Sequence, residues 1–193
     1  MNARPGPEDA IALGCAWFLH CRRIDISALA DALGVNRVTL YRWFGTRDRF
    51  LVEVVWSLTQ RALADLDRDV TAGGAERVVG LAVGLLRIGL ATPGMRRWLA
   101  EEGEHAMRVL SRHETDFQPR LIAAFETVLR QEQAAGRLDL PVELSELAFV
   151  IVRLLESYAY LDLITGEPAR AQRAEPVLRM LLRADEAPGV TGA

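Results

Sequence analysis

The chain has 193 residues, of which half are apolar, and a formal net charge of −3. That length suffices for one substantial core, or for a small domain joined to a larger one. The most apolar stretch, 147–164, contains Arg153, Glu156 and Asp162, which excludes a membrane span, and the first residues do not have the pattern of a signal peptide. Cys15 and Cys21 are too far apart on one helix for a disulfide, so two free thiols and a cytoplasmic location are expected.

Positive charge is concentrated near the N-terminus. Residues 1–61 contain eight arginines and six acidic residues, and only one acid accompanies four arginines between positions 36 and 49. A locally basic segment on an acidic body is expected of a nucleic-acid-binding protein, although so small an excess can also arise by chance. All 23 basic residues are arginine, which suits phosphate and guanine, but codon bias explains this equally well.

Helical periodicity runs through the chain, and strand and hairpin signals are nearly absent. The sequence therefore predicts an all-α fold with an N-terminal three-helix domain at 1–50, to which the next motif assigns DNA binding, a C-terminal antiparallel helical bundle at 51–184, and a disordered tail at 185–193. About nine helices are expected, at 8–20, 26–33, 37–44, 47–70, 75–91, 94–110, 117–135, 143–165 and 171–183.

The segment 25–49 has the pattern of a helix-turn-helix. Asp25 and Asn36 are suited to cap two short helices, and Gly34 is suited to the left-handed turn between them. On the second helix, Leu40 and Phe44 share one face and are expected to point to the core. The opposite side and the start of the next helix are expected to contact DNA through Arg37, Val38, Thr39, Tyr41, Arg42, Trp43, Thr46 and Arg47.

These residue types have different expected roles in a DNA complex. Arg37 and Arg42 can reach guanine or phosphate, and Val38 can contact a thymine methyl group. The Tyr41 hydroxyl can donate to a phosphate, and Arg47 completes a phosphate site in the first turn of the next helix, which Thr46 caps. Trp43 alternatively packs on the neighbouring domain.

The motif in this segment resembles the DNA-binding domain of TetR-type regulators. The matching residues read L-A-x-x-L-G-V-N-x-x-T-L-Y-x-x-F-x-T-R-D from position 29 to 48, although Val38 replaces a residue that is often small and Arg47 one that is usually lysine. More loosely, stretches 117–122, 132–138, 150–158 and 162–167 are similar to a QsdR-like branch of that family.

The resemblance implies a homodimer that binds double-stranded, palindromic operator DNA through its two-fold symmetry, with the last two helices of each subunit at the interface. A heptad-like seam on 143–165 agrees with this, although a fully buried helix of a monomer would show the same pattern. The expected interface residues are Leu147, Ile151, Leu154, Tyr158, Val177 and Leu181.

The resemblance also implies an effector pocket in the C-terminal bundle, and a small, largely apolar organic ligand is expected there. Arg153 and Glu156 can alternatively pair with each other or bridge two subunits, Trp98 can be a core residue, and His105 can lie on the surface. The candidate pocket residues are Arg87, Trp98, His105, Phe125, Arg153, Glu156 and Tyr160.

Motifs of catalysis, metal binding and phosphate cradling are missing from the sequence, so no enzyme activity, cofactor or metal is expected. The predicted function is a sequence-specific repressor that a ligand releases from its operator. Two alternatives are open. One is a ligand-independent architectural or constitutive repressor, in which no small molecule raises the melting temperature. The other is a protein-interaction adaptor, which binds no DNA even at low salt.

Overall fold

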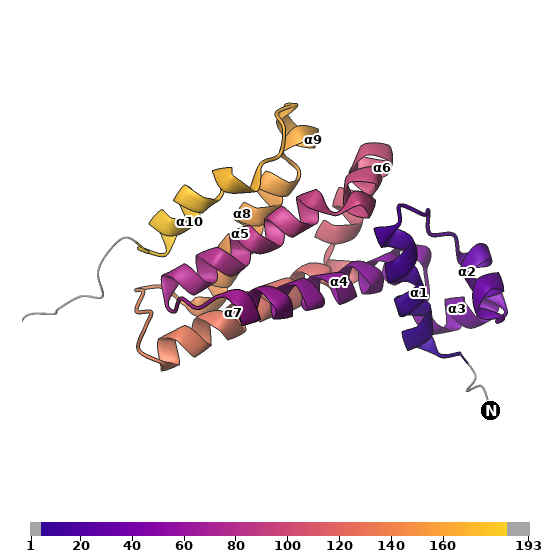
Figure 1. Cartoon of the computed structure of the whole chain (residues 1–193), viewed down its shortest axis with the longest axis horizontal. Helices are drawn as coiled ribbons and strands as arrows, with labels where there is room; N and C mark the ends of the chain where they lie inside the picture. The colour runs from indigo at the N-terminus through magenta and orange to yellow at the C-terminus, as the bar shows by residue number, and fades with distance from the viewer. Residues whose placement is uncertain (1–4, 185–193) are drawn as a thin grey trace, which may run out of the picture. The chain divides into compact units, whose positions relative to one another are not determined.

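The computed structural model describes residues 5–184, apart from the side chain of His113, so the expected tail at 185–193 lies outside the described residues. Within that part of the chain all regular structure is helical, which confirms the all-α fold (Figure 1). The α-helices are α1 (Pro7–Leu19), α2 (Ile26–Leu33), α3 (Arg37–Phe44), α4 (Arg47–Asp69), α5 (Ala75–Ala91), α6 (Pro93–Ser111), α7 (Phe117–Ala134), α8 (Leu144–Ala159), α9 (Leu161–Thr165) and α10 (Glu175–Leu181), with 3-10 turns η1 (His113–Thr115) and η2 (Ala171–Arg173).

The predicted helices at 143–165 and 171–183 are wrong in part. The first is interrupted at Tyr160, whose φ of −105° and ψ of 17° are not helical, and its last turns form the separate helix α9. Gly166 then ends α9 in the left-handed conformation at φ 75°. The last predicted helix begins with the 3-10 turn η2, and α10 starts only where Pro176 occupies the first helical turn.

The helices form two compact units. The first contains the chain up to Arg61 together with Ala91–Phe117. It therefore includes α1, α2, α3, α6 and the part of α4 up to Arg61. The second contains Ala62–Leu90 and the chain from Gln118 onwards. These units are defined by packing, and the functional boundary expected at residue 50 stays a prediction.

In the first unit, helix α1 lies very close to α4 and α6. A Cβ atom on Gly14 would lie 2.6 Å from Val54 Cγ2, and one on Gly94 would lie 1.9 Å from the Phe18 carbonyl oxygen. Both positions therefore require glycine. Phe50 is completely buried in this core. Cys15 and Cys21 are free thiols, as expected.

The second unit has an apolar core, and among its described residues one charged side chain, that of Glu132, is fully buried. Glu132 is completely inaccessible, and its carboxylate accepts hydrogen bonds from the Gly74 N–H (2.6 Å), Arg77 Nη1 (2.6 Å) and Arg137 Nε (2.6 Å). The bond from Arg137 is the main reason why the pKa of Glu132 falls to about 2, against the opposing effect of burial. This cluster therefore ties α5 and α7 to the loop that contains Arg137. The largest fully buried apolar side chains of the unit are Leu81, Phe125, Leu129, Ile151, Leu178 and Leu182.

No single helix in the described part of the chain has the length and apolar character needed to cross a membrane. Helices α5 and α6 meet that test only when they are counted together across the bend between them.

Candidate nucleic-acid interface

The two ends of α2 are fixed as the sequence predicts. The Asp25 side chain accepts a hydrogen bond from the Ala28 N–H at 2.8 Å, which caps the first turn. Gly34 ends the helix at φ 67° and ψ 30°, and the Val35 N–H donates to the Ala30 carbonyl at 3.0 Å. This Schellman-type end redirects the chain abruptly from α2 towards α3.

Helix α3 is capped at its start and anchored through one side. The Asn36 side chain accepts from the Val38 N–H at 2.9 Å, and Leu40 is only 1% exposed. Phe44, expected on the core side, is half-buried and packs edge-on against Phe50 at a ring distance of 4.8 Å. The inward face of α3 therefore rests on α4 through an aromatic contact.

The opposite face of α3 is open to solvent. Val38 is 67% exposed and Tyr41 43% exposed, and Arg37 and Arg42 are exposed as well. Thr39 and Trp43 are half-buried, and Trp43 packs edge-on against Phe44 at 6.3 Å. An exposed helix face with a valine, a tyrosine and two arginines has the chemistry that base edges and phosphates require.

The start of α4 differs from expectation at Arg47. Thr46 is exposed and caps α4 as predicted, because its hydroxyl accepts from the Arg49 N–H at 3.1 Å. The Arg47 side chain turns inward instead. Its Nε donates to the Ile24 carbonyl at 2.9 Å, and its Nη1 lies 3.5 Å from a carboxylate oxygen of Glu102. The predicted phosphate contact of Arg47 therefore needs this guanidinium to leave, or to share, an internal partner.

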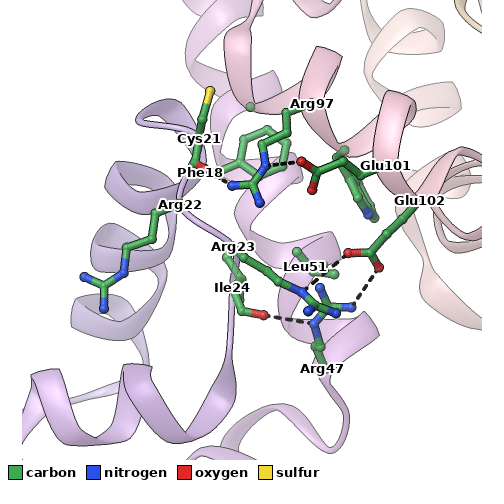
Figure 2. Close-up of a pocket in the computed structure, with 12 residues that line it drawn as sticks. Phe18, Cys21, Arg22, Arg23, Ile24, Arg47, Leu51, Arg97, Glu101 and Glu102 are labelled. Atoms are coloured by element: carbon green, nitrogen blue, oxygen red, sulfur yellow. Dashed lines mark hydrogen bonds and ion pairs between the residues drawn. The ribbon is translucent and has the colours of Figure 1, made fainter.

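Arg47 belongs to a charged cluster around the loop between α1 and α2 (Figure 2). Arg97 donates to the carbonyl of Cys21, a residue in the left-handed conformation at φ 56°, and its Nε lies 2.8 Å from Glu101. This pairing with Arg97 holds the pKa of the Glu101 carboxyl below its usual range. Glu102, at a bend of α6 with φ −134° and ψ 38°, lies 3.7 Å from Arg23 Nε.

The cluster encloses only a small cavity, of about 30 Å³. That volume accommodates a water molecule and is too small for an organic effector. Trp98, one of its lining residues, is 6% exposed, and its indole N–H has no hydrogen-bond partner among the described residues. A water in this cavity is the ordinary way to satisfy such a donor.

Comparison with known proteins identifies the family. Residues 73–183, more than half of the chain, match the model of the tetracyclin repressor-like C-terminal domain. The chain is a TetR-family transcriptional regulator. No curated protein sequence matches it significantly.

Solved structures of several transcriptional regulators share the fold of this chain. The transcriptional repressor QsdR of R. erythropolis is 24% identical over 92% of this chain and 94% of its own, with a TM-score of 0.83. A putative transcriptional regulator from Rhodococcus sp. RHA1 is 18% identical over 92% and 96%, with a TM-score of 0.61. A putative TetR-family regulator from Rhodococcus sp. is 19% identical over 93% and 96%, with a TM-score of 0.56. These identities establish a common fold, and the QsdR-like branch stays a prediction.

The candidate effector residues of this TetR-family chain do not converge on one cavity. Trp98 packs edge-on against Phe18 at 6.1 Å, and His105 Nε2 lies 3.1 Å from Asp48, both within the first unit. In the second unit, Arg87 is exposed on α5 and Tyr160 is buried where α8 ends.

Arg153 and Glu156 lie next to each other, in agreement with the alternative that these two side chains pair. One guanidinium nitrogen of Arg153 is 2.7 Å from the Glu156 carboxylate, which also accepts from Gln118. The buried Nε and Nη2 atoms of Arg153 have no hydrogen-bond acceptor among the described residues. The two charges are therefore close, but the N–H groups of Arg153 do not point at the Glu156 oxygen. Burial raises the pKa of the Glu156 carboxyl, and Arg153 and Gln118 oppose that change.

Of the candidate pocket residues, Phe125 lines an apolar cavity of the second unit. This cavity has a volume of about 280 Å³ and lies between α4, α5 and α7. Its volume is near the lower limit for small-molecule sites. The other residues that line this cavity were not predicted from the sequence; they are Leu63, Ala64, Asp67, Leu81, Ala124, Thr127 and Val128.

The predicted dimer contacts need a correction on α8. Leu147 and Ile151 are 2% and 0% exposed, so they belong to the subunit's own core and their assignment to a partner interface is wrong. The exposed apolar residues of α8 lie on another side of the helix, at Phe149 (45%) and Val150 (42%). Leu154, Tyr158, Val177 and Leu181 are half-buried and stay candidates, and Met180 on α10 is 74% exposed.

Among the described residues, no group of three histidine, cysteine or acidic side chains is arranged to hold a metal ion.

Proposed function

We propose that this TetR-family regulator is a homodimeric repressor that binds a palindromic operator through the exposed face of α3 and is released by a small, largely apolar ligand. It acts by binding, without catalysis or a cofactor. The observation that carries the proposal is the contrast between the two sides of α3: Leu40 on the inner side is 1% exposed, whereas Val38 on the outer side is 67% exposed. A helix whose inner face is packed against the rest of the domain can present the side chains of its outer face to a major groove.

The division of roles along α3 follows from side-chain chemistry. Arg42 and Arg37 are exposed forks that match the acceptors of guanine or the oxygens of a phosphate. Val38 offers an apolar contact for a thymine methyl group, and Tyr41 a hydroxyl for the backbone. Arg42 is therefore proposed as the main base-reading residue.

Two features of the second unit support the dimer and the ligand. Phe149, Val150 and Met180 leave exposed apolar area on α8, the last long helix, and on α10, the final helix of the described chain, where the family resemblance expects the partner. The cavity beside Phe125 has a mainly apolar lining and one acid, Asp67, which is 2.7 Å from Arg77. A ligand that prefers the conformation unable to bind DNA would lower operator affinity by that preference alone.

The DNA-binding part is tested by selecting bound duplexes from a random library and repeating the selection with Arg42→Ala. A symmetric consensus is expected for the wild type, and a loss of preference at one base pair per half-site, worth about 1–3 kcal/mol, for the variant. Arg61→Ala, an exposed arginine on α4 beyond the DNA-facing segment, is the matched control and should leave the consensus unchanged. An unaltered consensus with Arg42→Ala removes this residue from base reading.

The ligand part is tested by a thermal-shift screen of small apolar compounds, followed by operator binding with each hit. A compound that raises the melting temperature and weakens operator binding supports the proposal. A protein that binds its operator and responds to no compound is the ligand-independent repressor.

A further inference from the structure

Arg47 and Glu102 form an ion pair inside the first unit, beside the proposed DNA-binding surface. We propose that Glu102 acts as an internal substitute for a DNA phosphate, so that it competes with the duplex for Arg47 and leaves the phosphate contact of this residue incomplete in the wild-type protein. The inference rests on the proposed function, because it describes how the DNA-binding surface is regulated.

The orientation of Arg47 is fixed independently of Glu102. Its Nε donates to the Ile24 carbonyl at 2.9 Å, and its side chain is 28% exposed. An arginine has five N–H donors in a rigid fork, and the bond to Ile24 uses one of them. The terminal nitrogens Nη1 and Nη2 are therefore held in a defined position, and their N–H groups remain available to donate to a phosphate.

The link to Glu102 is close enough for attraction and too long for a strong bond. Its carboxylate oxygens lie 3.5 Å from Arg47 Nη1 and 3.7 Å from Arg23 Nε, whereas charged N–H···O bonds are about 2.7–2.9 Å long. The Glu102 side chain is 26% exposed, so water screens the pair. A phosphate offers the same kind of anionic oxygens to the same donors and can replace the carboxylate.

The surroundings of Arg47 are suited to an anion. Arg47 is the first residue of the 23-residue helix α4, whose N-terminal turn attracts negative charge, and Thr46 before it is exposed. The acid already in this turn, Asp48, lies 3.1 Å from His105. Glu102 itself is at the bend of α6, so a change in that bend alters its distance from Arg47. The restraint on Arg47 can therefore vary with the conformation of α6.

The test compares wild type with Glu102→Gln on a fluorescent mixed-sequence duplex of about 30 base pairs. Anisotropy titrations between about 50 and 200 mM NaCl give the dependence of log Kobs on log[salt]. Glu102→Gln should bind more tightly, with a slope steeper by up to about 0.9 for each subunit on the DNA, because Arg47 then completes a phosphate contact that Glu102 weakens in the wild type. At that upper value, the gain in affinity at about 50 mM NaCl is about 3.5 times the gain at about 200 mM for each subunit.

A matched control separates this effect from a general change of charge. Glu104→Gln removes the same charge from an exposed position on the same helix and should leave the slope unchanged. Arg47→Gln should bind more weakly than wild type, and adding Glu102→Gln to it should restore nothing. An ion pair with only a structural role would instead lower the melting temperature without steepening the salt dependence.

Each outcome decides the proposal. If Glu102→Gln melts far below wild type, Glu102→Asp replaces it, since the shorter side chain withdraws the carboxylate and should give part of the gain. Unchanged or weaker binding with an unchanged slope in both variants overturns the role of Glu102 and leaves the regulator function intact. A wild-type protein that binds no duplex at about 50 mM salt overturns the DNA-binding function itself, and this inference with it.

Discussion

The buried carboxylate of Glu132 offers the sharpest test of the second unit. Replacing it by glutamine keeps the size of the side chain but removes the charge that faces Arg77 and Arg137, and it places an NH₂ group against donors. The four hydrogen bonds to this carboxylate, from the Gly74 N–H, Arg77 and twice from Arg137, are 2.6–3.0 Å long. At least one of these donors loses its acceptor in the variant.

The size of the effect follows from the pKa of Glu132. A fall from 4.5 to about 2 means that the folded state favours the ionised form by about 3 kcal/mol. Glutamine resembles the protonated form, so Glu132→Gln should lower the free energy of unfolding by about 3 kcal/mol at pH 7. The same magnitude is found when one partner of other buried ion pairs is removed.

The pH dependence gives a second measurement of the same energy. Because the pKa is lower in the folded protein, the stabilisation is complete above pH 4.5 and disappears as the pH falls towards 2. The difference between wild type and Glu132→Gln should therefore shrink through that interval. It is measured by urea unfolding at several pH values, followed by far-ultraviolet circular dichroism, which reports on all helices.

The protein provides its own internal control for this experiment. All four tryptophans, at 17, 43, 56 and 98, belong to the first unit, so their fluorescence follows that unit separately. Asp65→Asn removes one partner of an exposed pair with Arg68 in the second unit and should cost less than about 1 kcal/mol. A difference for Glu132→Gln below about 1 kcal/mol, or one that does not change with pH, would refute the electrostatic reasoning.

Three further substitutions test the rest of the structure. Phe149→Glu should produce monomers in light scattering while the fold is retained, whereas Ile151→Glu should unfold the second unit; a dimeric Phe149→Glu protein would place the partner surface elsewhere. Asp25→Ala removes the cap of α2 and should cost about 0.5–2 kcal/mol, measured by urea unfolding with tryptophan fluorescence; no change would mean that another group satisfies the Ala28 N–H. Gly94→Ala should destabilise the first unit by about 1–3 kcal/mol in the same assay, and a neutral result would show that α6 can move away from Phe18.

The parts of the fold that depend on local chemistry could be predicted from the sequence. Asp25, Gly34 and Asn36 act on residues two to five positions away, so their types and spacing suffice to define the ends of α2 and α3. The exposure of Val38 and the burial of Leu40 follow in the same way from helical geometry.

What could not be predicted depends on partners that are distant in the sequence. Glu102 is 55 positions from Arg47, and nothing in either segment indicates that their side chains meet. The break at Tyr160 has no glycine or proline to mark it. Helix α8 has apolar residues on two sides, so periodicity alone did not show that the side with Ile151 is internal and the side with Phe149 exposed.

The contact of Gly94 with the carbonyl of Phe18 has a consequence for protein engineering. The first unit is not a continuous stretch of polypeptide, because residues 91–117 complete it after about 30 residues that belong to the other unit. A chimera that exchanges only the first 50 or 60 residues between relatives would press a foreign α1 against the resident α6, where there is no space for one methyl group. Successful exchange of the first unit between relatives should therefore require a second crossover that transfers α6 as well.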